Sequence, residues 1–334
     1  MARRIAAVVS IIFCCWQFCA AQEANSLDSA VRYAAKFATG AGTVSSPWVG
    51  WERAVSEAPA TSRVVFAAGK YATATGVIIR TNILIEGAGA RGTEIIATRP
   101  MPFVIGSDGT NARYFGLRSL VVNANHLATN ALLLIKPTAF DVPALENVMA
   151  KGATSAGVVV RGCQLCTMRG VHSTQNGGEG ISLEGCNGSV ASGVMSTKNG
   201  GDGIVLRKYV EGSTTFSGGM SFYGIDAESN GGHSVNIIDT LTPVSFFGGW
   251  IEGGAPGKDG FHITAPVVSI SGMRISGKNA GTQGYAINLL AGAEAADIRG
   301  VMLINEAGEF AQIRVAGSIK TGTFEPSVGQ VKRQ

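Results

Sequence analysis

Acidic residues and a histidine recur at one position of a repeated segment in the middle of the chain. A glycine or serine and then a short apolar run follow directly after Glu179, Asp202, His233 and Asp259. If the segments stack, neighbouring carboxylates repel, so the pKa of one rises and suits a general acid beside an ionised base. Glycoside hydrolysis requires such a pair of carboxyl groups. We therefore expect Glu179 and Asp202 to be a catalytic acid and base, with His233 orienting them.

Two other positions of the same segment add polar side chains to the same side. The residues expected to bind a substrate are Arg161, Glu184, Arg207, Asn236, Asp259 and His262. The cations among them suit an acidic sugar chain. Solvent-facing positions are often polar simply because water hydrates them, so a plain solvated surface is the alternative interpretation.

Asn-Gly-Gly marks the turn before three of these segments. It begins at Asn176, Asn199 and Asn230, which are 23 and 31 residues apart. Short runs with a period of two residues alternate with Gly and Asn turns, and no helical period of useful length separates them. A unit of this length cannot bury its apolar face alone, so it must stack on its neighbours.

The stacked units predict an all-β fold, a single-stranded parallel β-helix. Leucine-rich repeats have similar periods, but their consensus is missing here, and propeller blades need longer repeats. In a β-helix each repeat is one coil, and equivalent positions of adjacent coils lie about 4.8 Å apart. The outward positions of a second strand column are expected to be mixed. They are His172, Met195, Asp226, Glu252 and Arg274.

The composition fits a globular, exported protein. The 334 residues are 46% hydrophobic, with 46 Gly and a formal net charge of +4. The apolar fraction excludes a disordered chain, and the small charge excess excludes a strongly basic nucleic-acid-binding surface. Residues 1–21 combine a basic start, an apolar stretch and small residues before Gln22, which predicts a signal peptide and a secreted or periplasmic protein. An uncleaved membrane anchor is the alternative, and no other run is long and apolar enough to span a membrane.

The rest of the chain divides into three expected parts. Residues 22–75 form an N-terminal cap with helices over 26–38 and 51–58, because the open apolar end of a solenoid needs a cover. Residues 76–316 form the β-helix, and residues 317–334, where the repeat pattern is lost, form a tail.

The opening of the repeat region resembles a known superfamily. The segments that carry the resemblance are Gly50-Trp51-Glu52-Arg53-Ala54, Val64-Val65-Phe66-Ala67-Ala68-Gly69-Lys70-Tyr71 and Ile83-Leu84-Ile85-Glu86-Gly87-Ala88-Gly89. They resemble the start of pectate-lyase-like right-handed β-helix proteins, which include pectate lyases, polygalacturonases and phage tailspikes. The resemblance implies a right-handed coil and a carbohydrate-active protein with a polysaccharide as its partner.

The resemblance also bears on the chemistry. Polygalacturonases place acids, a histidine and cations on successive coils, and the matching acids and histidine here are Glu179, Asp202 and His233, whereas His262-Ile263-Thr264 replaces the family's Arg-Ile-Lys. A hydrolase with another sugar specificity is therefore expected. A pectate-lyase-type lyase is the alternative: Arg161 or Arg207 would take the C5 proton of a uronic sugar. Calcium among Glu179, Asp202 and Glu184 would suit that alternative, but no dense aspartate cluster is present, so we expect no cofactor.

A polysaccharide-binding or surface protein without activity is the third possibility. Such a protein would stack aromatic side chains on sugar rings, and Tyr209, Phe222 and Trp250 are the candidates, although packing in the core or a loop explains each of them as well. The extra residues of the longest coil, near 209–216, would form a groove wall, because insertions in a solenoid often gather on its binding face.

Three cysteines remain after the predicted signal peptide. Cys163 and Cys186 hold equivalent places in adjacent repeats, so they should stack as thiols, with a disulfide between them as the alternative. Cys166 follows Cys163 without a second ligand pair, which excludes a typical zinc site. Three is an odd number, so at least one thiol is free or pairs between chains.

Overall fold

The computed structural model describes residues 30–80, 82–89, 92–107, 109, 115–135, 144–211, 213–215, 217–240, 243–252, 254–276, 284–304, 312–316, 321–325 and 330–333. The predicted signal peptide lies outside these residues. In the described part of the chain, no helix has the length and apolar character needed to cross a membrane.

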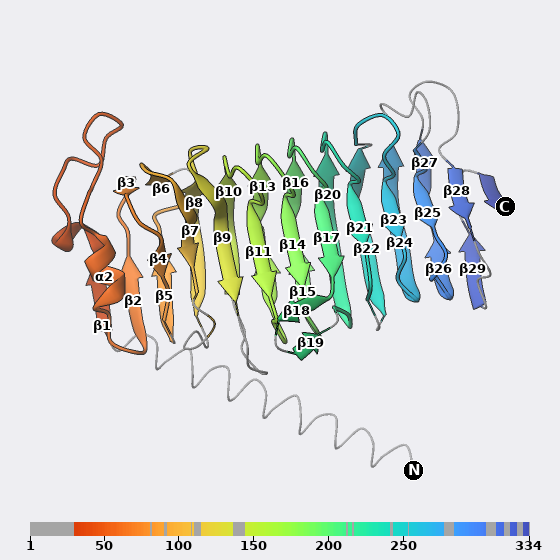
Figure 1. Cartoon of the computed structure of the whole chain (residues 1–334), viewed down its shortest axis with the longest axis horizontal. Helices are drawn as coiled ribbons and strands as arrows, with labels where there is room; N and C mark the ends of the chain where they lie inside the picture. Colours follow the sequence, from red (N-terminus) through yellow and green to blue (C-terminus); the bar gives the residue numbers. More distant parts are fainter. Residues whose placement is uncertain are drawn as a thin grey trace, which may run out of the picture.

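The chain winds into a parallel β-solenoid whose coils follow one another along the long axis (Figure 1). Each strand pairs with the equivalent strand of the next coil. An 11-stranded sheet contains β4 (Val77–Ile78), β7 (Met101–Gly106), β9 (Ala128–Ile135), β11 (Val158–Arg161), β14 (Ile181–Glu184), β17 (Ile204–Arg207), β21 (Val235–Ile237), β23 (Phe261–Ile263), β25 (Ile287–Leu289), β28 (Gln312–Val315) and β30 (Gln330–Arg333).

The other walls belong to one 17-stranded sheet that bends around the coil. It contains β1 (Ala30–Tyr33), β2 (Ser62–Val65), β3 (Gly69–Thr73), β5 (Ile83–Glu86), β6 (Thr93–Ala97), β8 (Gly116–Asn123), β10 (Ala144–Lys151), β12 (Thr167–Arg169), β13 (His172–Thr174), β15 (Val190–Ser192), β16 (Met195–Thr197), β20 (Met220–Glu228), β22 (Val244–Glu252), β24 (Val267–Ser276), β26 (Ala295–Arg299), β27 (Met302–Ile304) and β29 (Thr321–Glu325). The bend falls on a glycine column: Gly170, Gly193 and Gly224 have φ of 59°, 58° and 60°, which glycine adopts without steric cost.

Period-two patterning places the apolar residues inside the coil. Ile181, Ile204 and Val235 are paired across β14, β17 and β21 and are fully buried. Each such side chain contributes roughly 1.5–3 kcal/mol of hydrophobic stabilisation. The core is therefore a set of aliphatic columns that fix the position of each outward side chain between them.

The Asn-Gly-Gly turns form a buried ladder. Asn176 Nδ2 donates to Asn199 Oδ1 at 2.8 Å, and Asn199 Nδ2 donates to Asn230 Oδ1 at 2.9 Å. All three side chains are buried. The side-chain amide of each turn thus finds its hydrogen-bond partner in the next turn, as buried polar groups require.

The N-terminal end is only partly helical. The helix expected over 26–38 is wrong for its described residues: Ala30–Tyr33 is strand β1, which pairs with β2, and Ala34–Phe37 is a short 3-10 helix, η2. Pairing with the next coil outweighs the weak helical pattern. The second expected helix is present as α2 (Glu52–Ser56). Trp51, just before it, is fully buried and donates its indole N–H to the Ala72 carbonyl at 2.8 Å.

The C-terminal residues continue the sheets. Within the expected tail, 317–334, strand β29 pairs with β26 and strand β30 pairs with β28. The repeat is hard to recognise there because the sequence of this segment lacks the Asn-Gly-Gly motif of the earlier coils. The described strands nevertheless extend both sheets of the solenoid.

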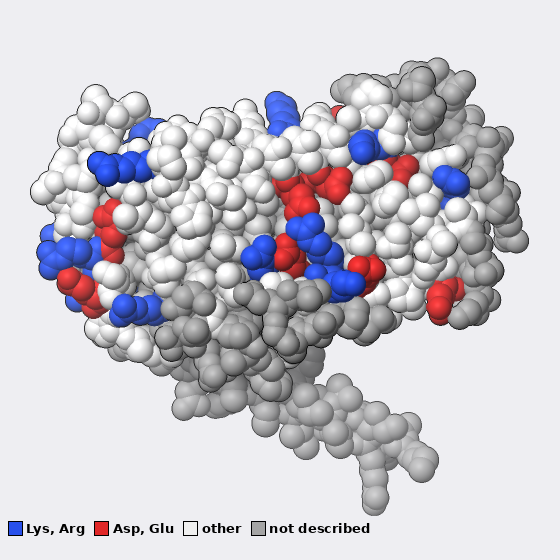
Figure 2. Space-filling view, viewed as in Figure 1, with Lys and Arg blue, Asp and Glu red and all other residues white. Residues whose placement is uncertain are grey.

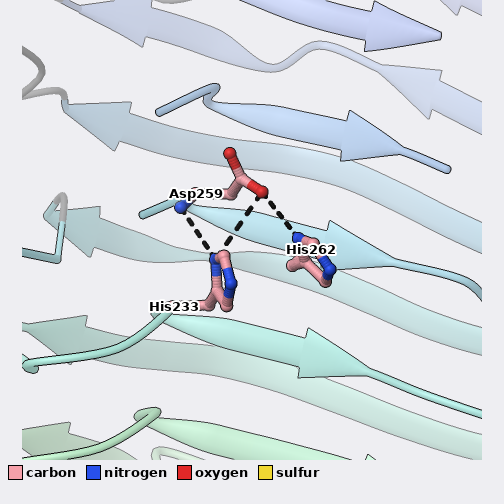
Figure 3. A group of neighbouring side chains, drawn as sticks. All are labelled: His233, Asp259 and His262. Atoms are coloured by element: carbon pink, nitrogen blue, oxygen red, sulfur yellow. Dashed lines mark hydrogen bonds and ion pairs between the residues drawn. The ribbon is translucent and has the colours of Figure 1, made fainter. Parts of the chain in front are cut away.

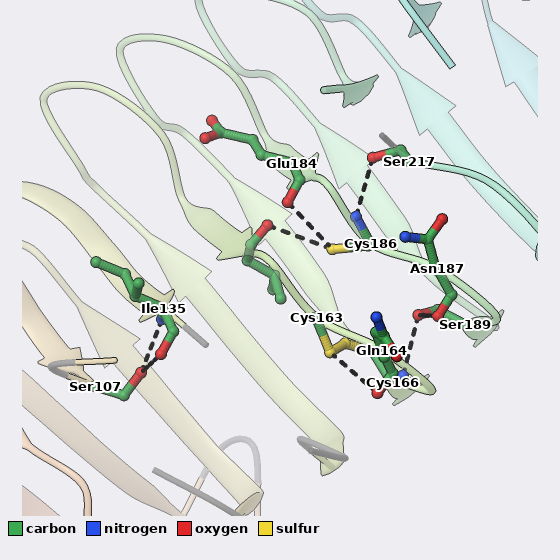
Figure 4. The surroundings of a disulfide bond; sticks show 11 residues. Ser107, Ile135, Cys163, Gln164, Cys166, Glu184, Cys186, Asn187, Ser189 and Ser217 are labelled. Carbon is green, nitrogen blue, oxygen red and sulfur yellow. Dashed lines mark hydrogen bonds between the residues drawn. A yellow bond between two sulfur atoms is a disulfide. The ribbon is translucent and has the colours of Figure 1, made fainter. Parts of the chain in front are cut away.

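The cysteines pair differently from the expectation (Figure 4). Cys163 is bonded to Cys166 in the same turn, with Cα atoms 6.1 Å apart, so the expected free thiol at Cys163 and the alternative Cys163–Cys186 bond are both wrong. Cys186 does occupy the equivalent place in the next coil. The backbone N–H of Asn187, the residue after it, donates to the Cys163 carbonyl. The Cys186 thiol is free and buried, and burial raises its pKa to about 12.

Candidate functional site

The repeated acidic position forms one column along the edge of the 11-stranded sheet. The Gly180 N–H donates to the Asp202 carbonyl and the Gly203 N–H donates to the His233 carbonyl, both at 2.8 Å. The Ser234 N–H donates to the Asp259 carbonyl at 3.1 Å. Figure 2 shows acidic and basic side chains gathered in the middle of this face, over the coils of β11 to β21. The column predicted from the repeats is therefore present.

Four charged side chains at one end of the face form an arginine–glutamate network. Arg207 donates to both carboxylate oxygens of Glu179, at 2.8 and 3.0 Å, and to Glu184 Oε1 at 2.8 Å. Arg161 Nε donates to Glu184 Oε2 at 2.7 Å. Burial alone would raise the pKa of Glu184, but the bonds and charges of Arg207 and Arg161 outweigh it and hold that pKa below its usual value. The network therefore keeps Glu184 ionised.

Asp202 lies between the network and the histidines. Its Oδ1 accepts the His233 backbone N–H at 2.6 Å, and its Oδ2 accepts an amide N–H of Asn236 at 2.7 Å. Both oxygens thus have neutral donors. Asp202 is only partly buried, so its carboxylate remains close to solvent.

His233, Asp259 and His262 form a compact histidine cluster (Figure 3). His262 Nδ1 lies 2.7 Å from Asp259 Oδ2, and the two imidazole rings are stacked with centroids 4.1 Å apart. The side chains of His233, Asp259 and His262 are 15%, 4% and 25% exposed. The carboxylate is thus buried beneath two imidazoles that reach the surface.

Neighbouring donors hold Asp259 in its ionised form. Burial would raise its pKa, but hydrogen bonds from His262, the Tyr285 N–H and the Asn288 amide lower it overall. The Tyr285 N–H donates to Oδ1 at 2.8 Å and Asn288 Nδ2 donates to Oδ2 at 2.9 Å. Since an ionised carboxylate only accepts, His262 Nδ1 carries the proton of this bond and His262 Nε2 is left as an acceptor in the neutral ring.

His233 has the opposite tautomer. Its Nδ1 accepts the Asp259 backbone N–H at 2.9 Å, so the proton of the neutral ring is on Nε2. Burial, and then the positive charge of a protonated His262, lower the pKa of His233. The cluster thus pairs an accepting Nε2 on His262 with a donating Nε2–H on His233.

Comparison with known proteins gives a match at the level of the fold. No family model matches the chain, and no curated protein matches it. Among solved structures, the A-modules of two mannuronan C-5 epimerases from Azotobacter vinelandii, AlgE6 and AlgE4, share 14% and 13% identity at TM-scores of 0.59 and 0.53. The matches cover 91% of this chain and 90% of the AlgE6 module, and 90% of this chain and 100% of the AlgE4 module.

A viral protein has a similar fold. ORF18 of Geobacillus virus E2 shares 12% identity at a TM-score of 0.58, over 92% of this chain and 60% of the viral chain. With the parallel register above, these matches decide the fold. The chain is a right-handed parallel β-helix.

Seven of the nine predicted site residues of the β-helix fall into two groups. Glu179, Glu184, Arg161 and Arg207 belong to the arginine–glutamate network, whereas His233, Asp259 and His262 form the histidine cluster. Asp202 and Asn236 are hydrogen-bonded to each other between them. The expected catalytic acid and base, Glu179 and Asp202, are adjacent in the column, but their side chains turn to different partners.

Asn288 is a site residue that was not predicted. It lies opposite His262 on the next coil and donates to Asp259. The signal was available, because Asn288 follows the apolar Ile287 at the same place as His262 and Asn236 in their coils. The repeat pattern does not indicate its role, because that role depends on the Asn288 side chain reaching a carboxylate of the neighbouring coil.

The aromatic candidates of the β-helix are separated. Phe222 is in the core, stacked on Phe246, and Trp250 is on the 17-stranded sheet, where its ring lies 4.1 Å from the Arg274 guanidinium. Tyr209 begins a hairpin of β18 (Tyr209–Glu211) and β19 (Ser213–Thr215), with Arg161 5.8 Å from its ring. Tyr209, the first residue of the predicted insertion, therefore lies beside the arginine–glutamate network.

Proposed function

We propose that this β-helix is an enzyme that acts on an acidic polysaccharide by proton transfer at the histidine cluster. The observation that supports this most is the Asp259–His262 bond beside a stacked His233 of opposite tautomer. A carboxylate that fixes an imidazole leaves its other nitrogen as a general base. The donating Nε2–H of His233 then supplies a hydrogen bond to the negative charge that develops on a leaving oxygen.

This pair of groups suits elimination from a uronic sugar. His262 Nε2 takes the C5 proton, the C5 electron pair forms a C4–C5 double bond, and the bond from C4 to the linking oxygen breaks. The Nε2–H of His233 donates a hydrogen bond to the leaving oxygen, which takes its proton from water. The step is thus a lyase reaction with His262 as base, in place of the arginine expected from the resemblance.

Two further observations support an acidic sugar chain as substrate. Arg161 and Arg207 are partly exposed on the same face, and Lys208 lies next to Arg207 in the sequence. Two epimerases with this fold are named for mannuronan. At such low sequence identity these matches support only the fold, so the choice of substrate is our proposal.

Hydrolysis is the second candidate. It is favoured by the adjacency of Glu179 and Asp202 in the column, where the Gly180 N–H bonds to Asp202. In this case Glu179 and Asp202 act as acid and base, with His233 orienting Asp202. Arg207 would then have to release Glu179, because it donates to both oxygens of that carboxylate.

We also propose that the protein is exported. Residues 1–21 have the pattern of a signal peptide. The Cys163–Cys166 disulfide supports the proposal, because such bonds persist mainly in oxidising compartments.

A product assay tests the proposed function. The chain is incubated with mannuronan and with polygalacturonate, and unsaturated ends are read by ultraviolet absorbance while reducing ends are read separately. A lyase gives both signals, and His262→Gln abolishes both. New reducing ends without absorbance, lost in Glu179→Gln and Asp202→Asn, would favour hydrolysis. If the protein retains a polysaccharide in a pull-down but gives neither signal, it is a binding protein and the proposed enzyme activity is wrong.

A further inference from the structure

The histidine cluster also has the composition and spacing of a metal site. We propose that His233, Asp259 and His262 bind one divalent transition-metal ion, represented by Zn²⁺, through the two Nδ1 atoms and Asp259 Oδ2. This inference goes beyond the polysaccharide activity and does not depend on it.

The three ligand atoms have the separations found around one ion. Asp259 Oδ2 lies 2.7 Å from His262 Nδ1 and 3.6 Å from His233 Nδ1, and the three residues each offer a ligand atom within 4.8 Å of the others. In a tetrahedral zinc site with bonds of about 2.0–2.1 Å, neighbouring ligands are about 3.3 Å apart. Figure 3 shows both Nδ1 atoms facing the Asp259 carboxylate. Small ring rotations would therefore bring the three atoms onto one ion.

Two buried amide oxygens beside the cluster lack partners. Asn236 and Asn288 lie on either side of His262 in the strand register and are 8% and 5% exposed. Within the described residues, Oδ1 of each has no hydrogen-bond partner. A zinc ion with three protein ligands keeps a position for water, and the protons of that water need acceptors such as these.

The donor set selects the class of ion. Two imidazole nitrogens and one carboxylate suit zinc, nickel or cobalt, whereas calcium prefers six to eight oxygens. The ion would replace the His262–Asp259 hydrogen bond and the bond from the Asp259 N–H to His233. Metal binding and the proton-transfer arrangement are therefore mutually exclusive, so zinc should inhibit any turnover that uses His262.

The test uses the full chain without an added histidine tag. The metal is first removed with a chelator, which is dialysed away, and Zn²⁺ is then titrated by calorimetry while the four histidine rings are followed by NMR. We expect one ion per chain and shifted ring signals for His233 and His262, with those of His126 and His172 unchanged. Ca²⁺ should give neither effect.

Variants locate the site. His233→Gln and His262→Gln should each weaken zinc binding roughly tenfold or more, whereas His126→Asn and His172→Gln should leave it unchanged. Less than one ion per chain, or ring shifts only at His126 or His172, would overturn the proposal, and the ring signals decide this on the wild-type chain even if a variant fails to fold. Zinc binding without polysaccharide turnover would leave the metal site standing and remove only the proposed function.

Discussion

Each carboxylate of the site is held by a different kind of partner. Guanidinium groups bind Glu179 and Glu184, an imidazole binds Asp259, and neutral N–H groups bind Asp202. The pKa values of Glu184 and Asp259 are both lowered. These two acids are therefore poor proton donors near neutral pH.

Removal of the proposed base should nearly abolish activity. His262→Gln keeps a polar side chain of similar length but has no basic nitrogen, so kcat on the acidic polysaccharide should fall about 100-fold or more. Asp259→Asn should also lower kcat, because a neutral amide does not stabilise the imidazolium that forms. Steady-state kinetics check both changes.

His172→Gln is the matched control, since His172 lies on β13 of the other sheet. It should retain wild-type kcat. Equal kcat in wild type, His262→Gln and Asp259→Asn would contradict the assignment of the base.

Loss of Arg207 should destabilise the fold in a pH-dependent way. Arg207→Ala removes a partner from Glu184, which is only 8% exposed, and Arg161 remains as its second partner. We expect a loss of about 2 kcal/mol of unfolding free energy near pH 7. Chemical denaturation at several pH values measures it.

The sign of the pH dependence follows from the lowered pKa of Glu184. A lowered folded-state pKa contributes stability above the unfolded value, about 4.5, and this stability is lost as the pH falls through the folded-state pKa. The difference between wild type and Arg207→Ala should therefore shrink in acid. Arg169→Ala, an exposed arginine on β12, should show little loss at any pH, and a loss equal to that of Arg207→Ala would argue against the buried-charge explanation.

At the scale of strands and turns, the asparagine ladder sets the register of the coils that carry the site. Asn199 accepts from the Asn176 N–H and side chain and donates to Ser196 and Asn230. Its loss leaves several buried groups without partners, at about 1–3 kcal/mol for each unsatisfied group. The ladder is thus a local source of stability next to the acidic column.

Asn199→Ala should lower the unfolding free energy by about 3 kcal/mol. The matched control is Lys198→Ala, since Lys198 is the exposed neighbour in the same turn and both variants introduce alanine. Thermal and denaturant unfolding compare the two. Similar losses in both variants would show that the turn backbone, and not the amide ladder, carries the stability.

The repeats predicted the strand columns but not every register. Glu252 was expected opposite Asp226, whereas Trp250 is paired with it. Gly249 lies where the other coils have an apolar residue after the bend glycine, so the repeat pattern is hidden there.

The Arg207–Glu179 hydrogen bonds were also not predictable from the sequence. They depend on how a long side chain reaches across the coils, and the repeat pattern does not specify that.

At the scale of the whole molecule, each coil contacts mainly its neighbours, so the ends need separate protection. Trp51 packs edge-on against Phe66 and Tyr71 at the N-terminal end. The need for a cover was predictable from the solenoid, but its partly strand-like form was not, because pairing with the next coil decides it.

Trp51→Ala should cost about 3–5 kcal/mol and expose the apolar end. We expect a lower melting temperature and association in size-exclusion chromatography. Tyr33→Ala, at a residue of the same end that is 51% exposed, is the control and should remain monodisperse. An unchanged melting temperature in Trp51→Ala would mean that the cover does not stabilise the solenoid.

The central claim is that His262 removes a carbon-bound proton. The most direct measurement compares kcat/KM for an acidic polysaccharide with hydrogen and with deuterium at C5, on the wild-type chain. We predict slower turnover of the deuterated sugar and an unsaturated product. Equal rates, with reducing ends and no unsaturation, would contradict the claim.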